Sequence, residues 1–188
     1  MIFSRPKPRG FKVKSKTLKQ IEANAKVFSA LLLFFSGRKT VKDIDLHRFL
    51  EDGIRFFGLH LEWVDDSDSE ELPLDTPAAV VGNVLKIRDA CYDGLGRKNP
   101  RDVFTLFHEL GHKFLGHERV FARSQIEDHF WNEDSEWQAN NFASEVLMPS
   151  SVILKENLRT VEQLKDRFGP ISTQAAELKL RKIFGYRI

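Results

Sequence analysis

Residues 99–116 read NPRDVFTLFHELGHKFLG, and this stretch decides the fold of the chain. It predicts a helix, because Asn99 is a capping side chain, Pro100 stands at the first helical position and Asp102 places an acid in the first turn. We expect this helix to end near Gly116. It is largely buried, because apolar residues cover nearly its whole circumference: Val103, Phe104, Leu106, Phe107, Leu110, Phe114 and Leu115.

Two histidines and a glutamate lie in the middle of this apolar helix. His108 and His112 are four residues apart, so both imidazoles project from one face and can reach one zinc ion at about 2.0–2.1 Å. Glu109 lies beside such a metal and can take a proton from a metal-bound water. Two structural alternatives are an ion pair between Glu109 and Lys113, and core histidines bonded to the main chain. Burial of the helix favours a metal site, because a buried polar group that has no hydrogen-bonding or metal partner costs free energy.

The next predicted helix, residues 132–148, supplies candidates for a third ligand, since catalytic zinc usually takes three protein ligands. Glu136 heads the apolar face of this helix and has no basic residue on that face. Glu133 is the second candidate and His129 the third. Glu145 lies half a helical turn away from this apolar face, and we predict that it faces solvent.

The remaining elements follow from the spacing of apolar residues. We expect an α+β fold with a long N-terminal helix, a small β-sheet and a C-terminal pair of helices. Helical spacing predicts helices over residues 17–35, 43–57, 161–168 and 173–184, whereas alternation predicts a strand over 59–64 and either a small hairpin or two short strands over 79–87.

The composition is that of an ordinary soluble domain, with 188 residues, 41% of them hydrophobic, and a net charge of +2. Cys91 is the single cysteine, which excludes an internal disulfide and a cysteine-rich metal site. The N-terminus lacks the apolar core of a secretory signal, and the longest apolar stretch, residues 27–35, is too short to span a bilayer. We therefore expect a cytoplasmic protein.

Residues 1–20 form a basic arm, because every charged residue in them is Lys or Arg. Such an arm could contact nucleic acid or an acidic partner. The favoured alternative is a solvated and partly mobile terminus.

Two stretches resemble the ImmA/IrrE family (IrrE N-terminal-like) of zinc metallopeptidases: FTLFHELGH at residues 104–112 and EWQANNFASEVLMP at residues 136–149. The resemblance extends over about residues 40–185 and implies a gluzincin-like core in which Glu136 is the third ligand. Asn140 matches a family position that supports a zinc-binding histidine from behind. His117 matches a frequent family histidine, which we interpret as structural.

The resemblance implies a peptidase domain over residues 21–150 and a helix-turn-helix-like extension over 151–188. It also implies hydrolysis of a regulatory protein, commonly a DNA-binding repressor or an antitoxin-like partner in stress-response or mobile-element switches. Tyr92 and His129 are candidates for stabilising the oxyanion. Mn²⁺ and Fe²⁺ suit the same ligands as Zn²⁺. Two alternatives are a non-proteolytic zinc-containing regulator and a toxin component of a two-gene module, either acting by binding a helix-turn-helix partner or DNA.

Overall fold

The computed structural model describes residues 9–117 and 129–185, so residues 1–8 of the predicted arm and 186–188 of the predicted extension lie outside the described residues. Within these ranges no helix combines the length and the apolarity needed to cross a bilayer. The helices are α1 (Leu18–Ser36), α2 (Leu46–Arg48), α3 (Asp89–Gly96), α4 (Pro100–Phe114), α5 (Ser135–Leu147), α6 (Ser150–Lys155), α7 (Val161–Phe168) and α8 (Thr173–Phe184). Short turns are η1 (Val41–Asp43), η2 (Phe49–Gly53), η3 (Ile54–Phe57) and η4 (Trp131–Glu133), and the strands are β1 (His60–Val64), β2 (Ala78–Val81) and β3 (Val84–Arg88).

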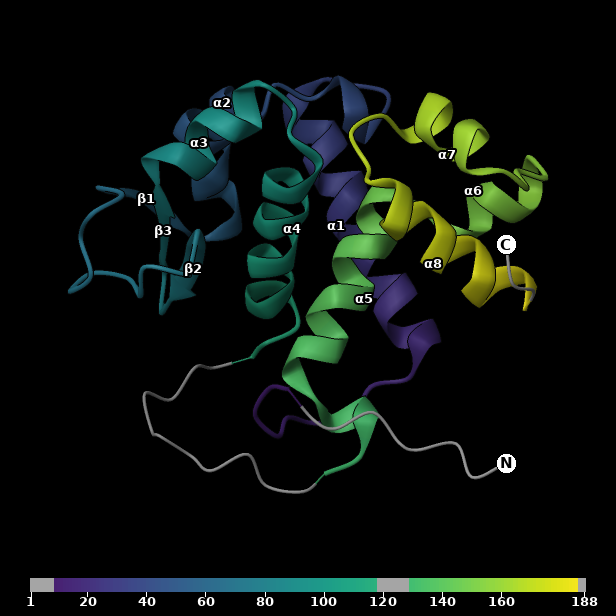
Figure 1. The fold of residues 1–188 in the computed structure, drawn as a ribbon, viewed down its shortest axis with the longest axis horizontal. Helices are drawn as coiled ribbons and strands as arrows, with labels where there is room; N and C mark the ends of the chain where they lie inside the picture. Colours follow the sequence, from purple (N-terminus) through teal and green to yellow (C-terminus); the bar gives the residue numbers. More distant parts are fainter. Residues whose placement is uncertain (1–8, 118–128, 186–188) are drawn as a thin grey trace.

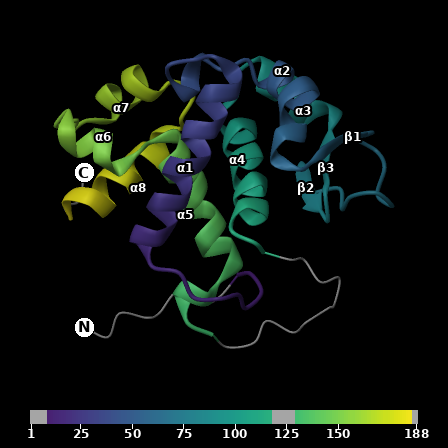
Figure 2. The ribbon, with the colours of Figure 1, turned by 180° about the vertical axis from the view of Figure 1, so that it is seen from behind.

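Helices α1, α4 and α5 form the centre of the molecule (Figure 1). The sheet lies with α2 and α3 on one side of α4, and helices α6, α7 and α8 lie on the other side of α5 (Figures 1 and 2). The edge strand β2 packs directly on α4. This helix-rich α+β architecture with a three-stranded sheet is the one that the sequence predicts.

The three central helices meet around Phe28, which is 1% exposed. Its ring lies 6.2 Å from that of Phe107 on α4 and 5.4 Å from that of Phe142 on α5. Gly111 sets the approach of α4 to α5, because a Cβ atom there would lie 3.0 Å from Phe142 Cδ1 and 3.4 Å from the Ala139 oxygen. The absence of that Cβ atom brings the histidine-bearing face of α4 close to the start of α5.

The predicted hairpin is confirmed, since β2 and β3 pair antiparallel and Gly82 takes a positive φ of 60° between them. The sheet order is β1-β3-β2, and β1 pairs parallel to β3 with His60 opposite Val84. The sequence did not predict this parallel pairing, because alternation identifies a strand without naming its neighbour.

The predicted helix over residues 43–57 is wrong as a single element. The Asp45 side chain accepts a hydrogen bond from the Arg48 amide at 3.1 Å, so the first helical turn begins at Leu46 instead. Gly53, a poor helix former, is the last residue of the π-helical turn η2 and precedes the 3₁₀ turn η3. Gly58, with a φ of 71°, ends the segment. The inward residues predicted there, Ile44, Phe49 and Ile54, are nonetheless buried.

The other predicted helices correspond to α1, α4, α5, α7 and α8, whereas α3 and α6 were not predicted. Asn99 caps α4 by accepting from the Arg101 amide at 2.9 Å, and Pro100 occupies the first turn as predicted. The helix ends at Phe114, two residues earlier than expected.

The prediction that Glu145 faces solvent is wrong. Glu145 is 8% exposed and forms an ion pair with Lys179 of α8, which is 3% exposed. Glu145 also accepts hydrogen bonds from the Ser150 amide at 2.9 Å and from the Ser150 hydroxyl at 2.7 Å. Helix α8 covers this face of α5 and carries its own cation into the contact.

Replacing Lys179 with Met should lower the free energy of unfolding by about 3–5 kcal/mol, because the substitution leaves the Glu145 charge buried without its cation. Urea denaturation measures this loss. The double variant Lys179→Met/Glu145→Gln should recover much of it, because Gln keeps hydrogen-bonding capacity toward Ser150 without a charge. A loss below about 1 kcal/mol, as at a surface pair, would contradict a buried ion pair.

Candidate metal centre

His108, Glu109 and His112 form a cluster on α4 in which the ligand atoms all lie within 4.8 Å of one another. The two histidines face each other, with 3.0 Å between their Nε2 atoms. His112 is 2% exposed and Glu109 is 5% exposed, so these two polar side chains are buried in the protein interior. The predicted geometry of two imidazoles one turn apart on one helix face is therefore present.

Glu136, in the first turn of α5, completes this cluster from the opposite side. Its Oε2 atom lies 3.1 Å from His108 Nε2, and its Oε1 atom lies 3.2 Å from His112 Nε2. The close contact of α5 with Gly111 of α4 explains this proximity. Glu136 retains a side-chain exposure of 28%, so the cluster opens to solvent on the carboxylate side.

The spacing of these atoms fits a single divalent cation. Two ligand atoms at about 2.0–2.1 Å from a tetrahedral zinc lie roughly 3.3 Å apart. The two Nε2 atoms lie 3.0 Å apart, and each lies 3.1 or 3.2 Å from a different oxygen of the Glu136 carboxylate, slightly shorter than that value. Two imidazoles and a carboxylate are also the donor types that zinc prefers. The residues present therefore fit the cation that the sequence predicts.

The carboxylate of Glu136 is held in its ionised form. Burial by itself would raise the pKa of Glu136, but its contacts with the His108 and His112 imidazoles at 3.1 and 3.2 Å outweigh burial and bring the pKa well below its usual range. A charged carboxylate facing two imidazole nitrogens is a cation-binding arrangement.

Glu109 points toward the sheet side of the cluster. Its Oε2 atom accepts a hydrogen bond from the Val80 amide of β2 at 3.1 Å, and its Oε1 atom lies 3.9 Å from His108 Nε2. The main chain of the edge strand thus orients this carboxylate beside the two histidines. The sequence offers no signal for this contact, because it comes from a backbone group 29 residues away.

Both histidines make a polar contact through Nδ1, the ring nitrogen that does not face the other histidine. Asn140 Oδ1 lies 3.2 Å from His108 Nδ1, which is the contact predicted for Asn140. His117 Nδ1 lies 3.1 Å from His112 Nδ1, and His117 Nε2 lies 3.0 Å from Gln138 Oε1. Burial lowers the pKa of His117 to about 4, so this ring is neutral near neutral pH. The sequence led us to interpret His117 as structural, and it did not single out Gln138.

The alternative ligands have partners elsewhere. Glu133 Oε2 accepts from the Phe130 amide at 3.2 Å and so caps its own turn. His129 Nε2 lies 3.2 Å from Asp134 Oδ2. Glu136, by contrast, faces both histidines.

Tyr92, a candidate for oxyanion stabilisation, lies on α3 and contacts Glu51 and His47. Its hydroxyl donates to Glu51, and its ring stacks on His47 with 4.0 Å between centroids. The described contacts of Tyr92 include none with the cluster on α4. The structure therefore gives no support to Tyr92 in that role.

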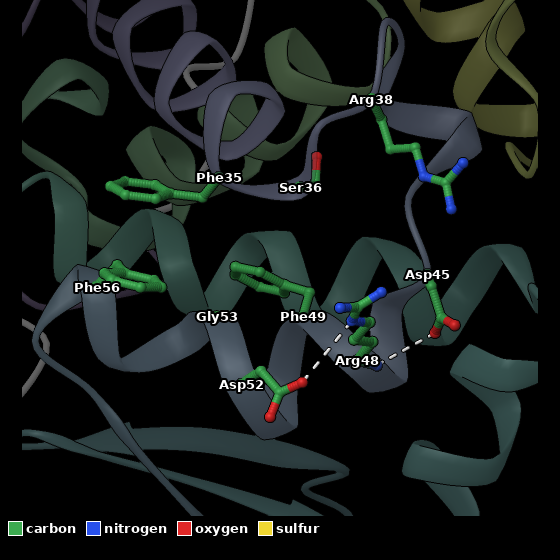
Figure 3. A pocket seen from close by; sticks show the side chains of 9 residues that line it. All are labelled: Phe35, Ser36, Arg38, Asp45, Arg48, Phe49, Asp52, Gly53 and Phe56. Carbon is green, nitrogen blue, oxygen red and sulfur yellow. Dashed lines mark hydrogen bonds and ion pairs between the residues drawn. The ribbon is translucent and has the colours of Figure 1, made fainter.

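A hollow of about 190 Å³ lies between the end of α1 and the segment from α2 to η3 (Figure 3). Phe35 and Phe56 stack across it at 4.4 Å, and Arg48 pairs with Asp52 along its rim. Its lining includes none of the four cluster residues, so the hollow is separate from the candidate metal centre.

Residues 97–181 match the sequence model of the IrrE N-terminal-like domain, the Peptidase_M78 family. This segment is therefore similar to that family. The match confirms the resemblance drawn from the two sequence stretches, and it includes α4, α5, α6 and α7 and most of α8. Because the family is one of metallopeptidases, an IrrE N-terminal-like domain implies a metal and a protein substrate. No match is found among curated proteins.

Proposed function

We propose that this chain is a zinc-dependent metallopeptidase in which His108, His112 and Glu136 hold the cation and Glu109 is the catalytic base. The observation that carries the proposal is the convergence of three donor groups from α4 and α5, with 3.0–3.2 Å between them. The match of residues 97–181 to a peptidase family supports the same reaction. Mn²⁺ or Fe²⁺ would suit this donor set as well.

A bound cation would supply Lewis acidity, which polarises the scissile carbonyl and makes water acidic enough to attack near neutral pH. Glu109 takes the proton of the attacking water as the oxygen–carbon bond forms. It then passes that proton to the nitrogen as the carbon–nitrogen bond breaks. The Val80 amide holds the Glu109 carboxylate in place for both transfers.

The substrate that we propose is a regulatory protein, such as a helix-turn-helix repressor or an antitoxin-like partner, in the cytoplasm. The choice of substrate is supported by the family resemblance alone. Two alternatives remain: a non-proteolytic zinc-containing regulator, and a toxin component of a two-gene module that binds a helix-turn-helix partner or DNA. A biological effect that survives loss of Glu109 would favour the first alternative, and co-purification of a helix-turn-helix protein would test the second.

Removing the cation should abolish cleavage, and adding zinc back should restore it. The probe is a library of peptides from a digested bacterial proteome, in which mass spectrometry detects newly formed peptide ends. A chelating phenanthroline should stop their formation, whereas its non-chelating isomer should leave it unchanged. Cleavage that persists in protein shown by elemental analysis to be free of metal would contradict the proposal. Zinc binding without any cleavage would favour the non-proteolytic alternative.

A further inference from the structure

The part of the N-terminal arm that the structure describes is bound to the segment preceding α5. Residues 9–16 run antiparallel to residues 132–135, with Lys12 bridged to Asp134. This differs from the solvated terminus favoured by the sequence. The main-chain hydrogen bonds are Ser135 N to Phe11 O at 3.1 Å, Val13 N to Glu133 O at 2.7 Å and Lys16 N to Asn132 O at 3.0 Å.

Gly10 brings the arm directly against the start of α5. A Cβ atom on Gly10 would lie 2.3 Å from Ser135 Oγ and 2.8 Å from the Glu136 amide nitrogen. The Asp134 carboxylate accepts hydrogen bonds from the Arg9 and Gly10 amides, each at 2.9 Å. The arm therefore packs on the turn that carries Glu136, and a larger residue at position 10 would displace it.

Gln138 connects the arm to the histidines. It is fully buried, and its Nε2 atom donates to the carbonyls of Lys14 at 2.9 Å and Asn132 at 2.8 Å. A carbonyl can only accept, so these two contacts fix which end of the amide is the nitrogen. The Oε1 atom of Gln138 is then the end that faces His117 Nε2, at 3.0 Å.

The orientation of Gln138 matches the proton positions that a cation-bound His112 requires. A histidine that binds a cation through Nε2 carries its proton on Nδ1, and His112 Nδ1 lies 3.1 Å from His117 Nδ1, which must then accept. With its lone pair on Nδ1, His117 carries its proton on Nε2 and donates it to Gln138 Oε1. His112 Nε2, the atom that faces His108 and Glu136, is thereby left for the cation.

We propose that the N-terminal arm is part of the metal centre: through Gln138 and His117 it keeps the proton of His112 on Nδ1 and thus presents the Nε2 lone pair to the cation. His117 and Gln138 are positioning residues, and the Lys14 carbonyl is the contribution of the arm. This inference rests on the proposed role of His112 as a ligand. It extends the site beyond residues 97–181, since the arm lies outside the family match.

Replacing His117 with Phe tests the relay, because Phe keeps the ring volume and lacks both nitrogens. Zinc affinity, measured by competition with a chelating dye, should fall about 10–100-fold. In the metal-free protein, ¹⁵N NMR of the imidazoles should show His112 leaving the Nδ1-protonated form, a change that a loss of packing alone would not produce. His117→Asn should restore much of the affinity, since its side-chain oxygen can stand where Nδ1 stood. His60→Phe, at an exposed histidine on β1, should change neither measurement.

Replacing Gly10 with Val tests the arm itself in the full chain. The arm should be displaced from α5, so zinc affinity should fall in the same range of about 10–100-fold and the His112 spectrum should change as in His117→Phe. Lys19→Ala, which removes a basic charge outside the contact, should bind zinc as the wild type does. Unchanged affinity and an unchanged His112 spectrum in both His117→Phe and Gly10→Val would overturn the inference. If the wild-type protein itself binds no zinc, the proposed function fails instead, so the two failures are distinguishable.

Discussion

Replacing Glu109 with Gln should lower the rate of peptide-bond cleavage by about 10²–10⁴-fold while zinc binding and folding stay as in the wild type. The side chain is 5% exposed, and Oε2 accepts a hydrogen bond from the Val80 amide at 3.1 Å. Gln offers a carbonyl oxygen to the same amide, so the contact with β2 survives. It cannot take a proton from water, so the proton transfer that assists the attack is lost.

Three measurements on one preparation separate this outcome from trivial ones. Zinc content should match that of the wild type, thermal unfolding should be unchanged, and the formation of new peptide ends should fall. Glu133→Gln is the matched control, because Glu133 caps the turn η4 and lies outside the cluster. Cleavage by Glu109→Gln at the wild-type rate would remove Glu109 from the mechanism.

The sequence predicted the centre of the site because one local rule governs it. His108, Glu109 and His112 lie on a single helix, so helical periodicity alone fixes their relation. Glu136 was predicted from the same periodicity on a second helix together with the family resemblance. What periodicity could not supply is the distance between the two helices. Gly111 sets that distance, because its missing side chain allows α5 to pack closely on α4. A glycine in a helical pattern does not show which other element packs against it.

Glu145 shows where helical periodicity fails. It lies off the apolar face of α5, and a charged residue in that position normally faces solvent. In the structure α8 covers this second face, and Lys179 supplies the cation that makes burial tolerable. The partner lies 34 residues further along the chain, so only the packing of α8 could reveal it.

The arm illustrates a different limit. Its lysines and arginines dominate the sequence pattern and suggested a solvated terminus, yet main-chain groups of Phe11 and Val13 bind it to the segment before α5. Backbone hydrogen bonds carry no residue signature, so composition cannot predict them. The same reason explains why the parallel pairing of β1 with β3 was missed.

Replacing Glu136 with Ala should weaken zinc binding by more than roughly 100-fold. Mutation of a residue that only hydrogen-bonds to a metal ligand costs up to about that factor, whereas Glu136 is proposed as a ligand itself. The two imidazoles would remain on α4, but the negative charge that faces both of them at 3.1 and 3.2 Å would be gone. Elemental analysis after dialysis against a competing chelator measures this loss. Glu133→Ala, at the second candidate for the ligand, should retain the metal.

Thermal unfolding with and without zinc gives an independent measure of the same ligand. A cation that binds only the folded protein stabilises it in proportion to the logarithm of its affinity, so a 100-fold loss of affinity removes about 2.7 kcal/mol of zinc-dependent stabilisation when zinc is in excess. The metal-free stability of Glu136→Ala should change far less, because 28% of the Glu136 side chain is exposed. If Glu136→Ala keeps its zinc and Glu133→Ala or His129→Ala loses it, the carboxylate that faces the histidines is not the third ligand. The cation would then have to lie nearer to the turn before α5, where Glu133 and His129 are found.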